Sequence, residues 1–396
     1  MSSSTGTAKL SFHVVSLFAL LMFNLNTLAE NRHLVQTDSW KTLTGETKGP
    51  SQATSFLRDI MNKSRITALS VAVIQDTRVV FQEIMGVVDP KTQKPVDTQT
   101  VLRAASLSKP VFAYLVMKMI DEGVISLDQP LFQSLEHPFV DFPQYSSLKG
   151  DQRYKLLTAR ILLSHAGGFP NWRRPRWTGR LDIKFNPGQT FSYSGEGYYL
   201  LQFVLEKKTG KNLSQLAKEK VFKPLDMTHS SFLWESRFEG NFAVDLRTIL
   251  ASLIRRTKTE ANSAASLLTN ASDYAKFLLA VLNGRDLKPE TASILRKPQL
   301  RVTGKALHNL EKPDTTLNED VQLSWTPGWG WFRSPVGEAL FHVGMEEGCE
   351  NYAVLFLERK IGIVIQSVSD LSRRISPMIV KELIGDIYSP FSWMRY

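Results

Sequence analysis

The sequence contains almost no cysteine and lacks the motifs that bind common cofactors. Cys349 is the only cysteine in 396 residues, so no intramolecular disulfide and no four-cysteine zinc site can form. The histidines His137, His165, His229 and His308 stand singly, without the H-x-H or H-E-x-x-H spacing of metal sites. The sequence has no phosphate-binding loop and no dinucleotide fingerprint. We therefore expect neither a metal nor a cofactor.

Long apolar runs are also scarce, and the run near the N-terminus is too short for a comfortable membrane span. It covers residues 14–23 and follows the basic residue Lys9. Thr27-Leu28-Ala29 then supplies small residues at the spacing that a signal peptidase needs. We predict an export signal over residues 1–29, cleaved near Ala29, and a periplasmic or secreted mature protein. An uncleaved N-terminal membrane anchor is the alternative.

The charge balance is basic, but its pattern does not indicate nucleic-acid binding. The formal net charge is +10, which favours association with acidic polymers or membrane surfaces. The basic runs at 173–176 and 255–256 are short and lack a nucleic-acid-binding pattern. We expect no nucleic-acid partner, while association with the cell envelope stays open. The 43% hydrophobic content is enough for a sizeable core.

Strand patterns occur at both ends of the chain. Residues 68–75 (ALSVAVIQ) and 79–86 (VVFQEIMG) predict the two strands of a hairpin. Four late strands are predicted at 328–332, 338–343, 351–357 and 361–367. A closing helix is predicted over 377–387, with Ser376 as its N-cap and Pro377 in its first turn. These positions imply one sheet assembled from N- and C-terminal segments.

The middle of the chain lacks strand alternation and is typical of helices joined by long loops. Helices are predicted at 156–165, 197–208, 213–221 and 271–282. A helical layer packed against the sheet would leave a cleft in which a site is expected. We predict four parts: an export signal (1–29), a linker (30–50), an α/β sheet subdomain (51–125 and 290–396) and a mainly helical subdomain (126–289).

The stretch from Val101 to Gly123 carries the main candidate for chemistry. Ser106 and Lys109 lie three residues apart at the start of an apolar helix, so their side chains share one face. Serine needs a nearby base at neutral pH, and a partly desolvated lysine whose pKa falls below about 10.4 can be that base. The N-terminus of such a helix also carries a positive dipole suited to an anion.

The S-x-x-K spacing is a weak signal by itself. Ser146-Ser147-Leu148-Lys149 also matches it, in a polar stretch with no apolar helix behind it, and is predicted to be a solvated loop. For Ser106, the alternative to catalysis is the N-cap of a helix. Other stretches of the sequence must decide between the two.

Two further stretches complete an ordered set of motifs. Residues 185–202 read FNPGQTFSYSGEGYYLLQ, and residues 341–344 read FHVG. Together with the Ser106 stretch, they resemble the S-x-x-K, Y-x-N and K-T-G or H-x-G motifs of the serine β-lactamase and penicillin-binding superfamily. The resemblance is to the branch with class C β-lactamases, carboxylesterases, D-aminopeptidases and D-alanyl-D-alanine carboxypeptidases. No G-x-S-x-G elbow exists, which argues against an α/β-hydrolase.

Connecting segments extend the resemblance to most of the chain, from about residue 51 to residue 387. They lie at 121–123, 127–130, 162–168 and 221–227. The resemblance implies an α+β, β-lactamase-like fold. In that fold an antiparallel sheet from the N- and C-terminal segments is flanked by helices and joined by a helical subdomain.

The resemblance also implies a role for each motif residue. Ser106 would attack a carbonyl and become acylated, while Lys109 would manage the proton of its hydroxyl. Tyr193 would carry the proton to the leaving group and later activate water, with a pKa lowered by the nearby lysine. Without the surrounding motif, the alternative for Tyr193 is a half-buried tyrosine with a structural role.

The third motif would complete the site. His342 and Gly344 are expected on an edge strand that lines the cleft. The backbone N–H groups of Ser106 and Met345 would form the oxyanion hole, where losing one donor typically costs about 3 to 4 kcal/mol of barrier. A histidine beside a strand is otherwise more often structural.

Two departures from the family pattern bear on the substrate. Gly195 stands where the family often has asparagine, so no side-chain amide is available there. His342 replaces the usual lysine of β-lactamases and holds a substrate carboxylate more weakly when neutral. Both changes favour esterase or D-amino-acid peptidase activity over efficient β-lactam hydrolysis.

The sequence therefore predicts an exported, monomeric serine hydrolase with an acyl-enzyme on Ser106. Its expected substrates are small esters or amides, including D-amino-acid peptides. Two alternatives stay open. One is a binding or sensor protein of the same fold that binds penicillin without turnover. The other is a structural protein of the cell wall that uses its basic surface.

Overall fold

The computed structural model describes residues 37–394, with several gaps inside this range. The gaps lie at 65, 174, 176–178, 246–258, 305–306, 308–315, 317 and 370–371. The expected export signal and its cleavage site near Ala29 lie outside the described residues. Among the helices that are described, none has the length and apolar character needed to cross a bilayer.

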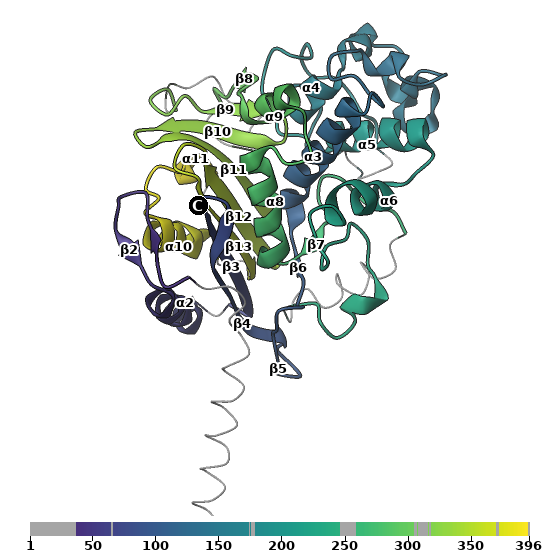
Figure 1. The fold of residues 1–396 in the computed structure, drawn as a ribbon. Coiled ribbons are helices and arrows are strands. Elements are labelled where there is room, and N and C mark those ends of the chain that lie inside the picture. The colour runs from purple at the N-terminus through teal and green to yellow at the C-terminus, as the bar shows by residue number, and fades with distance from the viewer. Residues whose placement is uncertain are drawn as a thin grey trace, which may run out of the picture.

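A nine-stranded antiparallel sheet forms the centre of the molecule (Figure 1). Its N-terminal and C-terminal strands meet where β3 pairs with β13 along their whole length. This pairing confirms the expected sheet built from both ends of the chain. In spatial order the strands are β5 (Lys94–Pro95), β4 (Arg78–Asp89), β3 (Ala68–Gln75), β13 (Ile361–Val368), β12 (Cys349–Phe356), β11 (Gly337–Glu346), β10 (Trp329–Ser334), β9 (Ser324–Thr326) and β8 (Leu300–Arg301).

The central strands are apolar on both faces because both faces are covered. In β3, Val71 and Val73 pack into one apolar core, while Ala72 and Ile74 pack into the other. Alternate side chains of a strand point to opposite faces, so a strand between two layers needs apolar residues at nearly every position. The single cysteine, Cys349, is fully buried at the start of β12.

Helices from the two ends of the chain cover the first face of the sheet. They are α2 (Pro50–Ser64), α10 (Ser372–Ile384) and α11 (Phe391–Met394). The segment expected to be a linker takes part in this layer. Its β1 (Trp40–Lys41) pairs with β2 (Thr47–Lys48), and the buried Trp40 indole donates to the Leu383 carbonyl at 2.7 Å. Part of the 30–50 segment is therefore packed structure.

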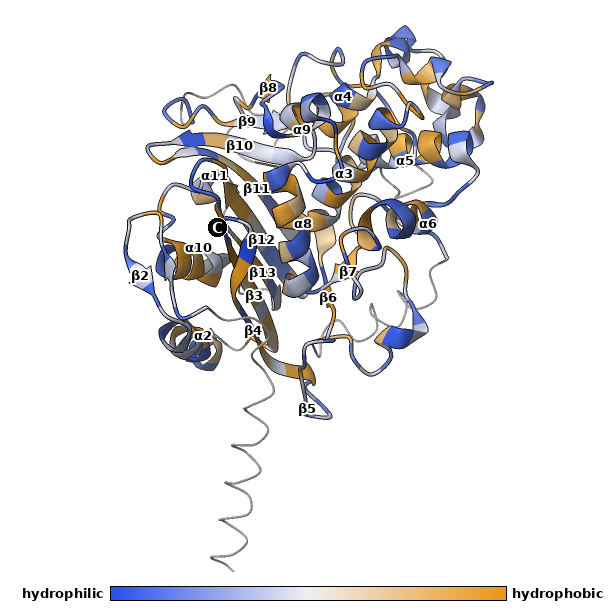
Figure 2. Cartoon of the chain, in the orientation of Figure 1, coloured by the Kyte–Doolittle hydropathy of each residue, from blue (hydrophilic) through white to orange (hydrophobic). Residues whose placement is uncertain are grey.

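Helix α8 (Ala271–Asn283) covers the second face and packs on β3 and β13. It falls inside the 126–289 range that was expected to form the helical subdomain, so the sheet layer takes one helix from that range. Figure 2 shows apolar and polar residues mixed along α8, as expected of a helix with one buried side. The division into subdomains is otherwise a prediction.

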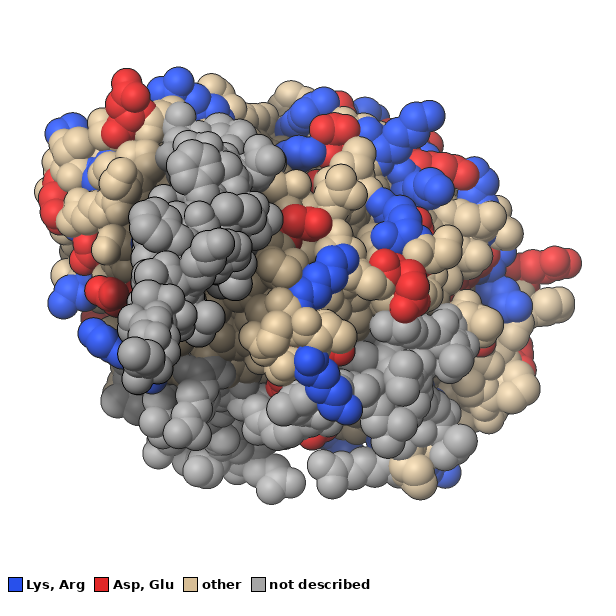
Figure 3. Space-filling view, turned by 90° about the horizontal axis from the view of Figure 1, so that it is seen from below, with Lys and Arg blue, Asp and Glu red and all other residues tan. Residues whose placement is uncertain are grey.

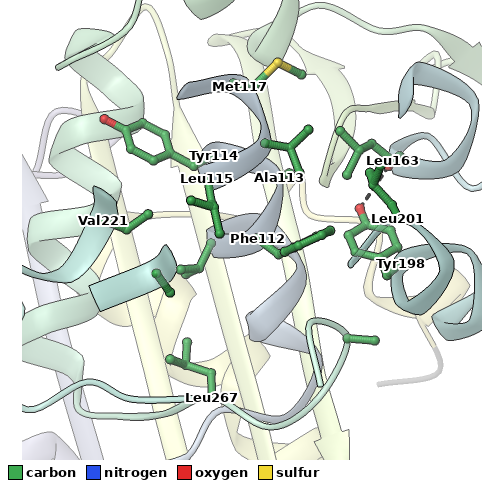
Figure 4. Close-up of a cluster of buried hydrophobic side chains, with 14 of the residues drawn as sticks. Phe112, Ala113, Tyr114, Leu115, Met117, Leu163, Tyr198, Leu201, Val221 and Leu267 are labelled. Atoms are coloured by element: carbon green, nitrogen blue, oxygen red, sulfur yellow. Dashed lines mark hydrogen bonds between the residues drawn. The ribbon is translucent and has the colours of Figure 1, made fainter. Parts of the chain in front are cut away.

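Helix α3 (Ser108–Asp121) lies between α8 and the helical region and is buried along most of its length. Figure 4 shows Phe112 and Leu115 among side chains from several other elements, with the Tyr198 hydroxyl donating to the Leu163 carbonyl at 2.9 Å. The helix ends as predicted, since Gly123 follows it with φ of +74°. The apolar run after Ser106 is therefore the core helix that the sequence indicated.

The helical region contains short helices joined by long loops. Its helices are α4 (Ala159–Leu163), α5 (Gly195–Thr209) and α6 (Leu213–Ala217), the last continued by a π-helical turn at Lys218–Phe222. Short 3-10 helices lie at Leu131–Gln133, Phe139–Asp141, Pro143–Leu148, Gln152–Leu156 and Ser236–Phe238. Helix α9 (Pro289–Arg296) and the pair β6 (Leu102–Arg103) with β7 (Leu268–Thr269) are further described elements.

Two sequence expectations differ from the structure. The closing helix begins at Ser372, so Pro377 lies inside α10 and Ser376 is a buried interior residue that does not cap the helix. The strand carrying the third motif, β11, lies between β10 and β12 and is an interior strand of the sheet. Its ladder with β10 ends at Phe341, however, so residues 342–346 extend beyond that neighbour.

Acidic and basic side chains are interspersed on the face seen in Figure 3. On the described residues of that face, neither sign forms a continuous field. The net positive charge is therefore not gathered into a single patch there, in keeping with the expectation of no nucleic-acid partner, which stays a prediction.

The buried carboxylate of Asp386 generates a prediction about stability. Its oxygens accept hydrogen bonds from Tyr388 N–H, Ser389 N–H and the Ser389 hydroxyl, which lies 2.6 Å from the Tyr352 hydroxyl. Burial raises the pKa of Asp386 despite these bonds. Wild-type stability should therefore fall as pH rises above about 3.8 through the raised pKa, because the folded protein holds this proton more tightly.

The Asp386→Asn variant can keep the two backbone hydrogen bonds on Oδ1, can donate its amide N–H to the Ser389 hydroxyl oxygen, and has no charge to bury. We expect the variant to become more stable relative to the wild type as pH rises from 4 to 7, so the difference between their free energies of unfolding should increase in favour of the variant. Urea unfolding across that range measures the difference. Parallel pH profiles for the two proteins would show that Asp386 does not titrate in this way.

Candidate active site

Ser106 lies in a tight turn at the entrance of α3. It belongs to the 3-10 helix η1 (Ala105–Leu107), and the preceding Ala105 has φ of +47°, a left-handed conformation that is uncommon for a residue with a side chain. The N-cap position of α3 is Leu107, and no side chain caps that helix. Ser106 is therefore not a helix cap, and its half-buried side chain lines a cavity.

Lys109 lies within hydrogen-bond distance of Ser106. Its Nζ is 3.1 Å from the Ser106 Oγ and donates to the Ala264 carbonyl at 2.9 Å. The side chain is fully buried. These contacts hold the amine beside the hydroxyl, as the three-residue spacing on a helix predicts.

Tyr193 completes the group from a distant part of the chain. Its ring centroid is 4.7 Å from the Lys109 Nζ, and its side chain lines the same cavity as Ser106, close enough to influence the pKa of the phenol. Burial raises the pKa of the Tyr193 phenol well above its ordinary value, and the Ser106 contact offsets only part of that rise. The expectation that the lysine lowers this pKa is wrong, because desolvation of a buried phenol outweighs other effects.

His165 lies next to Tyr193, a position at the site that was not predicted from the sequence. Its ring lies 4.3 Å from the Tyr193 ring, centroid to centroid, and its Nδ1 accepts a hydrogen bond from the Ser194 N–H at 3.0 Å. The residue is fully buried and has φ of +56°. It therefore positions Tyr193. Residues 162–168 are recognisable in the sequence as a connecting segment of the family. His165 was considered there only as a possible metal ligand, because the spacing of histidines carries no signal for a contact with Tyr193.

Strand β11 approaches the Ser106 turn at Gly344. A side chain there would place its Cβ 2.3 Å from the Ala104 carbonyl oxygen, so only glycine permits this approach. The Asn351 amide fixes the same junction by donating to the Arg103 carbonyl at 2.9 Å. Close contact between strand and turn explains the glycine of the third motif.

His342 and Met345 lie differently with respect to the cavity. Met345 and Val343 line it, together with Ser106 and Tyr193. His342 is fully buried and lies on the same side of β11 as Gly344, with its Nδ1 2.7 Å from the Val343 carbonyl oxygen. A carbonyl only accepts, so the Nδ1 carries the proton. The His342 ring lies 6.0 Å from the Tyr193 ring, centroid to centroid.

Gly195 occupies a position where the Trp172 indole replaces the missing side chain. A Cβ on Gly195 would lie 2.5 Å from the indole Cη2. The Gly195 N–H donates to the side chain and backbone oxygens of Asn171, each at 3.0 Å. Where a family asparagine would present an amide, this chain presents a flat apolar ring that lines the cavity.

A buried ion pair fixes the Trp172 loop. The Arg173 Nη2 lies 2.7 Å from the Glu196 Oε2, and the Arg173 backbone N–H donates to Oε1 of the same carboxylate at 3.1 Å. Both side chains are almost fully buried. Glu196 lies in the first turn of α5, where the helix dipole favours a negative charge.

The cavity beside Ser106 is small, at about 110 Å³. Its wall includes the loop around Ala265, whose neighbour Ala264 holds Lys109. No sequence pattern pointed to this loop, because its contact with Lys109 is made by a backbone carbonyl. Within the described part of the chain, no group of three His, Cys, Asp or Glu side chains is placed to bind a metal ion.

The second S-x-x-K match lies apart from this cavity. Residues 143–148 form a short 3-10 helix, the Ser146 hydroxyl donates to the Pro143 carbonyl, and Lys149 pairs with Asp141. It is ordered surface structure where a loop was expected, and it brings together no comparable group of side chains.

Comparison with known proteins identifies the family. The family model described as Beta-lactamase matches residues 53–374, so the chain belongs to the beta-lactamase family. It is 20% identical over 351 residues to Protein flp of Staphylococcus aureus strain MRSA252, covering 84% of this chain and 65% of flp. It is also 22% identical over 199 residues to Esterase EstB of Burkholderia gladioli, covering 44% of this chain and 49% of the esterase.

A solved structure shows the same fold. The octameric penicillin-binding protein homologue from Pyrococcus abyssi aligns with a TM-score of 0.65 at 21% identity, covering 85% of this chain and 77% of that chain. The expected β-lactamase-like, α+β fold is therefore confirmed. The expected monomer stays a prediction.

The contact between Gly195 and Trp172 generates a prediction. Gly195→Asn forces the indole out of its place and should lower the free energy of unfolding by about 1 to 3 kcal/mol, the usual cost of overpacking. The double variant Gly195→Asn with Trp172→Ala should recover most of that loss. Thermal and urea unfolding measure both.

Gly197→Ala is the matched control on the same helix. Its Cβ would meet its nearest neighbour, the Leu162 Cδ2, at an ordinary 3.4 Å. It should be neutral or stabilising, because alanine is the better helix former. An equal loss in both single variants would mean that the indole contact is not the cause.

Proposed function

We propose that this protein is a serine hydrolase that cleaves small esters or amides through an acyl-enzyme on Ser106. The observation that carries the proposal is the convergence of a hydroxyl, an amine and a phenol in one cavity. The Lys109 Nζ is 3.1 Å from the Ser106 Oγ, and the Tyr193 ring packs over the same amine. Membership of the beta-lactamase family supports this chemistry.

In the proposed reaction, the Ser106 Oγ forms a bond to the substrate carbonyl carbon and its proton passes to the Lys109 Nζ. The N–H groups of Ser106 and Met345 stabilise the resulting oxyanion. The Tyr193 phenol, protonated because of its raised pKa, donates a proton to the leaving group as the bond to that group breaks. Lys109 returns a proton to Tyr193, and water then releases the acyl group by the reverse sequence.

The cavity favours a small acyl group and an ester or simple amide. About 110 Å³ beside Ser106 accommodates few heavy atoms, and Trp172 occupies the place of the family amide. An esterase among the relatives agrees with this substrate class. We propose ester or D-amino-acid peptide hydrolysis ahead of efficient β-lactam hydrolysis.

We also propose that the protein works outside the cytoplasm as a monomer after export. The basis for export is the N-terminal sequence pattern described above. Cell fractionation with N-terminal sequencing, and light scattering of the purified protein, are the direct measurements.

Covalent labelling tests the nucleophile. A fluorophosphonate should add to Ser106 in the wild type, as mass spectrometry of peptides detects, and hydrolysis of a short-chain aryl ester should stop. Ser106→Ala should abolish both, while Ser146→Ala, at the second S-x-x-K match, should leave both unchanged. A folded protein with unlabelled Ser106 contradicts the mechanism, and a stable adduct from every ester without turnover indicates a binding protein.

Tyr193→Phe tests the proton donor. We expect kcat/KM to fall by about 10² to 10⁴ for an alkyl ester or amide, whose leaving group needs a proton. For a nitrophenyl ester of the same acyl group the loss should be much smaller, because that leaving group departs as an anion. Stopped-flow or steady-state kinetics with the two substrates give the comparison. Equal losses would assign Tyr193 a purely structural role.

Trp172→Ala tests the limit on the acyl group. Removing the indole enlarges the cavity, so the preference among nitrophenyl esters should move from acetyl towards longer chains. Each additional buried methylene is worth about 0.8 kcal/mol, so a shift of two carbons corresponds to roughly 10-fold in relative kcat/KM. An unchanged chain-length profile would show that Trp172 does not bound the acyl site.

A further inference from the structure

A second and larger cavity adjoins the one at Ser106. Its volume is about 730 Å³, and Ala265 and Glu346 line both cavities. The smaller cavity contains the nucleophile and takes the acyl group in the proposed reaction. The larger cavity, which we call the second chamber, is therefore placed to hold the leaving group of the same substrate.

Three carboxylates line the second chamber: Glu206, Glu260 and Glu346. Arg173 also lines it, but its guanidinium is bound to the buried Glu196 carboxylate and to the Gln144 carbonyl. Glu346 pairs with Arg103 at 3.7 Å, whereas neither Glu206 nor Glu260 lies within ion-pair distance of a cation among the described residues. The wall of the second chamber is thus acidic.

The electrostatics of the chamber agree with its lining. Burial raises the pKa of Glu206, and the Glu260 charge adds to that rise. Burial and the nearby carboxylates, Glu260 first among them, raise the pKa of Tyr199 to about 12. Tyr199 and Phe203 contribute aromatic rings to the wall. Carboxylates together with aromatic faces are the side chains that recognise an organic cation.

Hydrogen bonds connect the chamber wall to the nucleophile. The Gln202 Nε2 donates to the Glu206 carboxylate at 3.1 Å and to the Ala261 carbonyl at 2.9 Å, while its Oε1 accepts from the Ser263 N–H at 2.8 Å. The next residue, Ala264, accepts from Lys109. The wall that separates the two cavities is therefore held in place from both sides.

We propose that the second chamber binds a protonated amine or quaternary ammonium group on the leaving group of the substrate. The inference rests on the proposed function for the position of the scissile bond. It narrows the substrate to esters or amides in which a small acyl group is joined to a cationic alcohol or amine. Glu206 and Glu260 act as specificity-determining residues and Tyr199 as an aromatic wall.

Ligand binding tests the chamber without any catalysis. Choline and its uncharged carbon analogue 3,3-dimethylbutanol have the same shape, so titration calorimetry of Ser106→Ala at low salt compares charge alone. We expect choline to bind at least about 5-fold more tightly than the alcohol. Equal affinities would overturn the proposal.

Charge removal locates the binding site. Glu206→Gln keeps an oxygen for the Leu213 N–H, and Glu260→Gln changes an exposed side chain, so both should fold. Each should reduce the preference for choline several-fold, and the double variant should abolish it. Glu290→Gln, an exposed residue of α9 that lines neither cavity, is the matched control and should bind like the parent. A preference unaffected by the chamber variants would also overturn the proposal.

Kinetics separate this inference from the proposed function. The acetate esters of choline and 3,3-dimethylbutanol are compared with the wild-type enzyme, and kcat/KM should favour the choline ester by at least about 5-fold. Equal hydrolysis of both esters rejects the cation site and keeps the hydrolase. Selective choline binding without hydrolysis of any ester rejects the hydrolase and keeps the site.

Discussion

A fully buried lysine is costly unless other groups hold it, and the site is arranged around Lys109 for that reason. Its amine is bonded to the nucleophile and to the Ala264 carbonyl, and two aromatic rings lie over it, those of Tyr193 and Tyr198. The contacts come from α3, from Tyr193 just before α5, from Tyr198 within α5 and from the loop at 259–266. Removing any one of these elements leaves the amine without part of its environment, so the site and the packing of the helical region depend on each other.

The sheet forms the opposite wall of the active-site cavity, and its distance from the Ser106 turn leaves no room for a larger side chain. At Gly344 the strand and the Ser106 turn approach so closely that a methyl group would overlap the Ala104 carbonyl. On the other side, the Arg173 and Glu196 pair holds the Trp172 ring against Gly195. Both glycines thus serve close packing. The chemistry sits between two walls whose separation is set by backbone contact on one side and by an indole on the other.

The sequence predicted the elements that carry a repeating apolar pattern. The strands at both ends, α3 and α8 have continuous or periodic apolar residues, and all were found close to their expected bounds. The start of α10 was misjudged because Pro377 and Ser376 imitate a helix N-terminus, although the helix begins several residues earlier. Local signals of this kind compete with packing, and here the buried face against β12 and β13 decides.

The site was predictable only in part. Ser106 and Lys109 are linked by helical spacing, and Tyr193 by an ordered motif, so their meeting could be expected. The Ala264 carbonyl and the His165 ring could not, because a backbone oxygen has no sequence signature and a single histidine has many roles. The pKa of Tyr193 was predicted in the wrong direction, since sequence shows a neighbouring lysine but not the depth of burial. The sequence shows that Gly195 lacks the side-chain amide of the family asparagine. Only the structure shows that the Trp172 ring fills the space beside it.

The pairing of β3 with β13 has a consequence for biogenesis. The hairpin of β3 and β4 is made early, yet β13, the strand that completes its inner edge, is synthesised only after the whole intervening helical region. Until then that edge exposes unpaired backbone groups and valine side chains, which are prone to join other chains. Closure of the sheet therefore awaits the synthesis of β13, and a chain shortened before β13 would leave the nascent hairpin without that partner in its own molecule.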